Sequence, residues 1–153
     1  MNSFKLKIPP AALLLICIGL MWTIQEFIQI EILLFDSERY IVRGLLVLGV
    51  IFGVLGVTEF SRRSTTINPH KPDKTTALVR SGIYRLTRNP MYLGMAIILL
   101  AAMVKFGNGI NILVIPVYIW VMNTSQIQPE EEVLEQKFGQ KYLDYKKEVR
   151  RWL

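Results

Sequence analysis

The sequence has only one cysteine and one histidine, and it lacks the short motifs of the common metal and nucleotide sites. Cys17 has no second cysteine with which to form a disulfide inside the chain, and it lies in an apolar run, so we expect a packed, unreactive thiol. No Cys-x-x-Cys, His-Glu-x-x-His, Walker loop or Gly-x-Gly-x-x-Gly occurs. With His70 alone and no cysteine cluster, we expect no metal site.

Charge is missing from long stretches of the chain. Apolar residues make up 52% of the sequence, yet the formal net charge is +6, because the 18 lysines and arginines gather mostly between apolar runs. A nucleic-acid-binding protein would carry positive charge over a soluble surface, so we expect no nucleic-acid partner. The segregation is typical of a small polytopic membrane protein, and the length predicts a single domain over residues 1–153.

Four apolar segments are predicted to cross the membrane, at about residues 8–30, 40–60, 90–106 and 110–127. The first holds an uncharged run of 18 residues without a small-x-small cleavage site after it, so we expect a retained helix rather than a secretory signal. The last two have apolar runs of 14 and 13 residues, joined by Gly107, Asn108 and Gly109. A tight hairpin of two spans is the favoured prediction, and three spans or a re-entrant hairpin is the alternative.

Glycines recur in the second span, where Gly49 and Gly53 form a Gly-x-x-x-Gly pair. Small residues at this spacing allow another helix to approach closely. We interpret the pair as a packing feature rather than as part of a site.

The most distinctive polar stretch lies in the loop 61–89 and at the start of the third span. Between Arg80 and Gly94 it carries three arginines and two tyrosines. Pro90 restricts Asn89 to extended geometry and can start a helix, so the arginines are predicted to lie at a helix N-terminus. Guanidinium groups and free peptide N–H groups there can receive a carboxylate or a phosphate. The alternative is a basic flank that only orients the next span.

The tail, residues 128–153, is polar and is predicted to form two short helices, so the predicted fold is an all-α membrane protein with a C-terminal amphipathic cytoplasmic segment. Pro129 precedes a run of glutamates, which favours a helix N-terminus at that point. The second helix should present an apolar stripe opposite basic residues, which is typical of a helix lying on an anionic membrane surface. The stripe consists of Tyr142, Tyr145, Val149 and Trp152.

The distribution of basic residues predicts the orientation of the spans. With four spans, the N-terminus, the loop 61–89 and the tail share one side and hold 15 of the 18 lysines and arginines. Both termini are therefore expected in the cytoplasm. The basic loop and the acidic start of the tail then face each other and can close over one polar ligand.

Two paired motifs resemble those of the isoprenylcysteine carboxyl methyltransferase family, especially its small bacterial members, over about residues 40–153. The resemblance includes the Asn68–Pro72 stretch. It implies an integral-membrane methyltransferase of the EC 2.1.1 class, related to phospholipid N-methyltransferases and placed in the bacterial inner membrane, which uses S-adenosylmethionine. The motifs are Gly82-x-Tyr84-x-x-x-Arg88-Asn89-Pro90-x-Tyr92-x-Gly94, Glu130-Glu131-x-x-Leu134 and Phe138-Gly139-x-x-Tyr142-x-x-Tyr145.

The resemblance also implies which residues bind the cofactor. We expect Arg88 and Asn89 at its methionyl end, with Glu130 and Glu131 accepting hydrogen bonds from ribose hydroxyls or the ammonium group. No catalytic residue is assigned, because methyl transfer from a sulfonium depends mainly on alignment, which Arg88 and Glu131 would provide. Tyr142 either covers the adenine or docks the tail. The predicted cofactor-binding residues are Tyr84, Arg88, Asn89, Pro90, Tyr92, Glu130, Glu131 and Tyr142.

Two departures from the family pattern bear on the methyl acceptor. The family usually has His at position 89, where this chain has Asn, and residues 123–128 lack the arginine that is thought to engage a prenylcysteine carboxylate. The acceptor is therefore predicted to be a lipophilic small molecule or a membrane lipid, methylated on a carboxylate oxygen or on an amine. The alternatives are an NADPH-dependent membrane reductase of similar fold and a non-enzymatic scaffold that binds anionic lipid.

Overall fold

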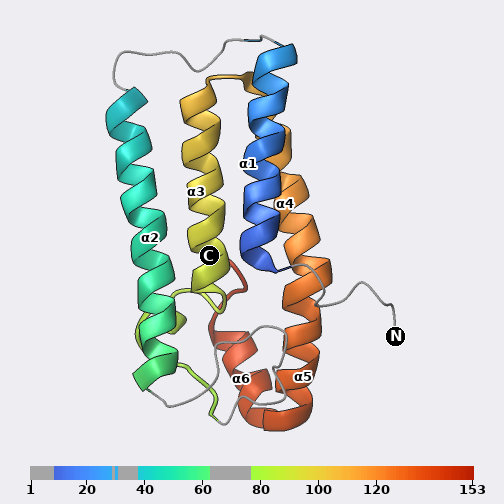
Figure 1. The fold of residues 1–153 in the computed structure, drawn as a ribbon. Coiled ribbons are helices and arrows are strands. Elements are labelled where there is room, and N and C mark those ends of the chain that lie inside the picture. The colour runs from blue at the N-terminus through green and yellow to red at the C-terminus, as the bar shows by residue number, and fades with distance from the viewer. Residues whose placement is uncertain (1–8, 29, 31–37, 63–76) are drawn as a thin grey trace.

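The computed structural model describes residues 9–28, 30, 38–62 and 77–153. The helices α1 to α4 lie side by side, and α5 and α6 gather at one end of the bundle, which we call the site end (Figure 1). The described part is helical with short connections, so the prediction of an all-α polytopic membrane protein is confirmed. The helices are α1 (Pro10–Phe27), α2 (Glu38–Arg62), α3 (Pro90–Phe106), α4 (Val114–Met122), α5 (Gln128–Phe138) and α6 (Gln140–Glu148).

Three helices in the described part of the chain are long and apolar enough to cross a membrane: Pro10–Phe27, Glu38–Arg62 and Gly109–Phe138. The third span predicted from the sequence is the shorter apolar helix α3, which has 17 residues. At about 1.5 Å per residue, α3 alone spans roughly 25 Å, slightly less than a hydrocarbon core.

The helix N-terminus predicted at Pro129 is wrong. A π-helical turn, η4 (Asn123–Ile127), joins α4 directly to α5, so Glu130 and Glu131 lie inside a continuous helix that runs from Gly109 to Phe138. A proline crowds the carbonyl four residues before it, and the wider π turn accommodates this crowding without ending the helix. The predicted end of this helix is confirmed, since Gly139 follows α5 with a φ of 52°.

Helices α2 and α3 touch backbone to backbone. A Cβ atom on Gly94 would lie 2.5 Å from the carbonyl oxygen of Gly49 and 3.1 Å from the amide nitrogen of Gly53. A Cβ on Gly49 would in turn lie 2.8 Å from the Gly94 oxygen. The predicted packing role of Gly49 is confirmed, whereas the Cβ direction of Gly53 is open, with no atom within 4 Å.

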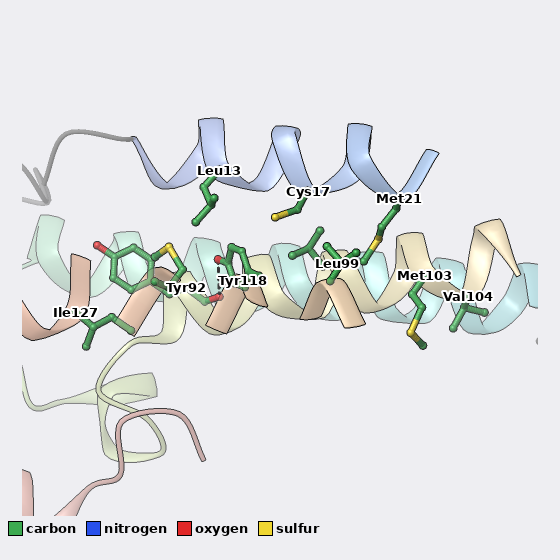
Figure 2. Close-up of a cluster of buried hydrophobic side chains, with 11 residues drawn as sticks. Leu13, Cys17, Met21, Tyr92, Leu99, Met103, Val104, Tyr118 and Ile127 are labelled. Carbon is green, nitrogen blue, oxygen red and sulfur yellow. Dashed lines mark hydrogen bonds between the residues drawn. The ribbon is translucent and has the colours of Figure 1, made fainter. Parts of the chain in front are cut away.

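The apolar core lies between α1 on one side and α3 with α4 on the other. Figure 2 shows Leu13, Cys17 and Met21 of α1 projecting toward the side chains of α3 and α4. Cys17 is buried and unbonded, as predicted. At the end of this core nearest the site, the hydroxyl of Tyr118 donates to the backbone oxygen of Tyr92 over 3.4 Å. The outer faces of the helices expose large apolar side chains, as expected of a surface that meets lipid.

The predicted hairpin between the third and fourth spans is present at the other end of the bundle. Gly107 ends α3 with a φ of 68°, and the short 3₁₀ helix η3 (Gly109–Leu113) then leads into α4. Asn108 is fully buried, where its side chain accepts from the amide of Ile110 and donates to the backbone oxygen of Ile28. This asparagine therefore ties the hairpin to the end of α1.

The apolar stripe of the tail packs onto the protein, so the prediction that it lies on a membrane surface is wrong. Tyr142, Tyr145 and Val149 are buried against Leu78, Leu134 and Phe138. Helix α6 ends at Glu148, which leaves Trp152 outside the helix. The residues after α6 turn back toward the start of α3 (Figure 1), and this return brings the tail to the polar loop.

Candidate functional site

An ion pair joins the loop before α3 to helix α5. The Nη2 atom of Arg88 donates to Oε1 of Glu131 over 2.7 Å, and each side chain is only 9% exposed. The positions are 43 residues apart, and Glu131 belongs to α5, which lies at the site end. The predicted meeting of a basic loop and an acidic segment on one side of the bundle is therefore confirmed for Arg88 and Glu131.

A second arginine, which the sequence analysis missed as a site residue, completes this ion pair. Nε and Nη2 of Arg151 donate to the two oxygens of Glu131 over 3.1 and 2.7 Å. The hydrogen bonds to Glu131 raise the pKa of Arg151, so this guanidinium stays charged. Glu131 therefore pairs with one arginine from the loop before α3 and one from the tail. We call Arg88, Glu131 and Arg151 the Arg–Glu–Arg cluster.

Backbone oxygens of the tail take most of the hydrogen-bond donors around Arg88. The Arg88 amide donates to the Arg150 oxygen over 3.0 Å, and its Nη1 donates to the oxygens of Lys146 and Val149 over 3.0 and 2.8 Å. The Nε atom of Arg88 is buried without a hydrogen-bond partner among the described residues. Arg88 thus retains one buried donor that no described residue satisfies.

Asn89 also points to the tail. Its Nδ2 atom donates to the backbone oxygen of Arg151 over 2.9 Å, and the hydroxyl of Thr87 donates to the same oxygen over 3.1 Å. Thr87 is fully buried, and it accepts from the Asn89 amide over 3.1 Å, which fixes the turn before Pro90. In this structure Asn89 therefore holds the tail against the start of α3.

Glu130 takes part in a different contact from its neighbour Glu131. The hydroxyl of Tyr92 donates to Oε1 of Glu130 over 2.6 Å. Glu130 is half-buried, and it forms no ion pair with any residue that the structure describes. Tyr92 lies in the first turn of α3, two residues after the buried Pro90, so the helix start that the sequence predicted positions this pair.

The remaining predicted site tyrosines hold the tail in place. The hydroxyl of Tyr145 donates to the backbone oxygen of Tyr84 over 2.7 Å, while the Tyr84 ring meets Phe60 edge-on. Tyr142 is buried beneath the ammonium of Lys146, which lies 5.8 Å from the ring centre. Burial raises the pKa of Tyr84, Tyr142 and Tyr145, so the phenols remain neutral. Of the two roles open for Tyr142, docking of the tail fits these contacts.

A buried glutamate at the end of α2, also missed from the sequence, positions the loop. Glu59 accepts from the hydroxyl of Ser81 over 2.7 Å, and Arg62 approaches its other oxygen at 3.4 Å. Gly82 has a φ of 57°, and a Cβ there would collide with the Glu59 carboxylate. The available signal was a lone acid near the end of an apolar span.

The π turn η4 sets the direction in which the side chains of Glu130 and Glu131 project from α5. It wraps one extra residue into the helix, which rotates α5 relative to α4 by about 100° compared with an uninterrupted α-helix. The ring nitrogen of Trp152 donates to Oδ1 of Asn123 in this turn over 3.1 Å, so the tail is also attached there. Neither the π turn nor the Trp152 contact had a recognisable signal in the sequence.

An open cavity of about 570 Å³ lies beside the Arg–Glu–Arg cluster. Val149 connects the two, because it lines the cavity and its backbone oxygen accepts from Arg88. Pockets of roughly 300–1,000 Å³ are typical of small-molecule sites. Its lining residues are Arg80, Ser81, Arg85, Tyr145, Glu148 and Val149.

The predicted site residues thus fall into two groups within the described part of the chain. Arg88, Asn89, Glu131 and the tail form one hydrogen-bonded cluster, and Tyr92 with Glu130 forms a second pair beside it. His70 and the Asn68–Pro72 stretch lie outside the described residues. Among the described residues, no three His, Cys, Asp or Glu side chains gather in a group that could hold a metal ion.

This fold and site define an integral-membrane α-helical protein with a polar, ion-paired site at one end of its bundle. The sequence matches the family model described as phospholipid methyltransferase over residues 39–141, which is more than half of the chain. The chain belongs to the phospholipid methyltransferase family. A methyltransferase family implies S-adenosylmethionine as the methyl donor.

Several relatives of the chain are isoprenylcysteine methyltransferases. The chain is 30% identical over 106 residues to the protein-S-isoprenylcysteine O-methyltransferase of Schizosaccharomyces pombe, covering 69% of this chain and 45% of that protein. It is 28% identical over 105 residues to protein-S-isoprenylcysteine O-methyltransferase B of Arabidopsis thaliana, covering 69% of this chain and 53% of that protein. The resemblance to isoprenylcysteine methyltransferases is therefore confirmed, and the chain spans about half the length of these two relatives.

A bacterial relative matches a shorter stretch more strongly. An uncharacterized protein of Haemophilus influenzae is 48% identical over 63 residues, which is 41% of this chain and all of that protein. No solved structure matches the chain. Together the comparisons support a methyltransferase over the reductase and scaffold alternatives.

Proposed function

We propose that this chain is an S-adenosylmethionine-dependent methyltransferase that acts on a lipophilic acceptor at the membrane. The observation that carries the proposal is the 2.7 Å ion pair between Arg88 and Glu131, which joins the loop before α3 to α5 in a member of a methyltransferase family. An arrangement that only oriented a membrane span would not need a buried carboxylate between two arginines.

The residues present fit the chemistry of the cofactor. S-adenosylmethionine carries a carboxylate, an ammonium, a sulfonium, a ribose and an adenine, and it supplies the methyl group when bound. The free Nε–H of Arg88 suits the carboxylate, and Glu130 supplies negative charge for a cationic group. The cavity bounded by Val149 and Tyr145 is of a size for the adenosine part. In this proposal Arg88 and Glu131 position the cofactor, and the other contributors are Tyr84, Asn89, Pro90, Tyr92, Glu130 and Tyr142.

The contribution of the protein would be alignment and exclusion of water. Methyl transfer from a sulfonium is an in-line displacement, and holding donor and acceptor in contact supplies much of the acceleration. The contacts that attach the tail at Asn89 and Asn123 would help to exclude water from a bound cofactor. The acceptor would enter from the apolar surroundings of the helices, because the start of α3 lies where the apolar bundle meets the polar site end.

The orientation in the membrane is part of the proposal. The predicted intracellular side holds 15 of the 18 lysines and arginines, so the site end and both termini would face the cytoplasm, where S-adenosylmethionine is made. For a bacterial chain this membrane is the inner membrane. Fusion of a reporter that works only in the cytoplasm to either end tests this directly.

Calorimetric titration of the purified full chain in detergent with S-adenosylhomocysteine tests the function. We expect saturable binding, and we expect Arg88→Ala and Glu131→Ala each to weaken it at least about tenfold. The first removes a guanidinium of the site, and the second leaves the buried Arg88 without its counter-ion. Matched controls are Lys141→Ala, in α6, and Glu132→Ala, beside Glu131 in α5, which remove exposed charges of the same sign. Thermal unfolding of each variant shows whether it is folded, and Arg88→Lys provides a milder substitution.

Three outcomes separate the alternatives. Folded wild-type protein that binds NADPH in preference to S-adenosylhomocysteine would identify a reductase. Absence of any saturable binding by either compound would leave a scaffold and overturn the proposal. Binding that is unchanged in both Arg88→Ala and Glu131→Ala would overturn the site assignment while leaving the function.

A further inference from the structure

Trp152 belongs to the polar tail, yet its side chain packs against the apolar core. It lies after α6, outside a helix, and it contacts the buried core between α1, α3 and α4. The residue before it, Arg151, donates instead to both oxygens of Glu131. Two neighbouring residues of the tail therefore meet the apolar core and the Arg–Glu–Arg cluster, so Trp152 lies at the boundary between them.

Four other side chains at this end of the core are closed to solvent and held by helices. Figure 2 shows Tyr92, Tyr118 and Ile127 toward one end of the core, and with Met122 they are at most 5% exposed. Each of the four lies in a helical turn of α3, α4 or η4. Trp152 is partly exposed and lies outside a helix. Of these five side chains, that of Trp152 moves most easily, because its movement breaks no helix.

Asn123 fixes the ring of Trp152. The indole Nε1 donates to Oδ1 of Asn123 over 3.1 Å, and Asn123 begins the π turn that joins α4 to α5. Such turns inside helices are frequent at functional sites. The ring is thus attached to the same turn that sets the direction of Glu130 and Glu131.

A lipophilic acceptor has to cross the boundary at which Trp152 lies. Its apolar part stays among the helices, while the methyl donor is bound at the polar site end. Transfer needs contact between the two reacting atoms, with water excluded. A closely packed protein interior leaves little free volume for a further apolar chain. The part of the acceptor next to its reacting atom must therefore pass the side chain that moves most easily.

We propose that the indole of Trp152 contacts the apolar chain of the acceptor and limits its width next to the reacting atom, so that this protein accepts unbranched rather than branched lipophilic molecules. Trp152 is a specificity-determining residue, and Asn123 is a positioning residue that holds the ring. The inference rests on the proposed methyltransferase function. It concerns the acceptor side of the site and uses none of the residues assigned to the cofactor.

Binding of two uncharged probes to the purified full chain, loaded with S-adenosylhomocysteine in detergent, tests the inference. The probes are tritiated hexadecanol and its branched counterpart phytanol, which has the same main chain with four added methyl groups. Uptake by empty micelles is measured separately and subtracted. We expect wild-type protein to bind hexadecanol about tenfold more tightly than phytanol, because a closed wall next to the chain has no room for the added methyl groups.

Four variants show whether Trp152 causes this preference. Trp152→Ala removes the ring, and we expect it to bring the two affinities within about twofold of each other. Asn123→Ala frees the ring and Trp152→Phe removes its N–H, so both should give an intermediate preference. Trp120→Ala is the matched control, since it removes a ring that is 66% exposed, and it should leave the preference unchanged. A purely structural role would lower both affinities together and would not change their ratio.

Several results would overturn the inference. They are equal binding of the two alcohols by wild-type protein, preference for phytanol, absence of saturable binding of either alcohol, an unchanged preference in Trp152→Ala, and an equal loss of preference in Trp120→Ala. If thermal unfolding shows that Trp152→Ala is not folded, an unchanged preference in both Trp152→Phe and Asn123→Ala overturns it. None of these results touches the proposed methyltransferase function as long as wild-type protein binds S-adenosylhomocysteine. Failure of that binding refutes the function and the inference together.

Discussion

The guanidinium of Arg88 and the carboxylate of Glu131 lie 2.7 Å apart and are both almost fully buried, although 43 positions separate them in the sequence. One belongs to the loop before α3 and the other to the helix that continues α4. The pair therefore connects the two halves of the helical hairpin α3–α4 at the site end. Loss of this pair should therefore lower the stability of the protein.

Removal of the Glu131 charge should be strongly destabilising. Glu131→Gln leaves Arg88 buried without a counter-ion and deprives Arg151 of its partner, which should cost about 3 kcal/mol of unfolding free energy. Thermal or denaturant unfolding in one detergent measures the difference. Glu132→Gln, next to it on the exposed face, should change stability by no more than about 0.5 kcal/mol. Equal effects of the two substitutions would contradict the buried ion pair.

The side chain of Arg151 should hold the tail in place, whereas that of Arg150 should not. Arg151→Ala removes two charge-assisted hydrogen bonds to Glu131 but leaves the backbone oxygen that binds Thr87 and Asn89. We expect hydrogen exchange of the tail to become about tenfold faster. Arg150→Ala removes an equal charge from an exposed side chain and should leave the exchange rate unchanged. The reverse order of effects would exclude the role given to Arg151.

The contact between α2 and α3 should tolerate no added methyl group at Gly94. In Gly94→Ala the new Cβ would meet the Gly49 oxygen at 2.5 Å, and we expect a loss of about 1–3 kcal/mol as the helices move apart. Gly53→Ala is the matched control, since its Cβ direction is open and alanine is the better helix former by about 1 kcal/mol. Melting temperatures in the same detergent compare the two. A destabilised Gly53→Ala beside a stable Gly94→Ala would show that the contact is misassigned.

The π turn should be required for the site. Deletion of Thr124 would restore an uninterrupted α-helical repeat and rotate α5 by about 100°, which turns Glu130 and Glu131 away from Tyr92 and Arg88. We expect helix content to persist by circular dichroism while binding of S-adenosylhomocysteine is lost. Thr124→Ala, which keeps the length of the chain, should retain binding. Binding by the deletion variant would show that the direction of α5 is unimportant.

Much of the fold could be predicted because it follows from apolar length and helix boundaries. The uncharged runs placed α1, α2 and the α3–α4 hairpin, and Pro90 marked the start of α3. The error at Pro129 has a physical cause: a proline preceded by polar residues is typical of a new helix, but a π turn before it allowed the old helix to continue. Such a turn depends on tertiary contacts, here the Trp152 hydrogen bond to Asn123, that a local pattern does not contain.

The candidate site was predicted in part. The pairing of Arg88 with Glu131 followed from the charge of the two segments and their common side of the membrane, whereas the role of Arg151 could not be separated from that of Arg150. Both are basic residues near the end of an amphipathic pattern, and only the chain reversal after Glu148 makes them different. The apolar stripe with Tyr142 and Tyr145 was predicted, but it packs on the protein rather than on a membrane surface. Leu78, Leu134 and Phe138 provide the apolar surface that covers it.

The close approach of Gly94 to Gly49 also limits how the protein can move. Two helices whose backbones approach this closely at Gly49 and Gly94 move as a rigid body, because sliding would drive the carbonyl oxygen of one against the backbone of the other. Shape changes during a reaction cycle must then fall on segments held by individual polar contacts. Substrate exchange in this protein would accordingly proceed by movement of the C-terminal segment after α6, while α2 and α3 stay in place.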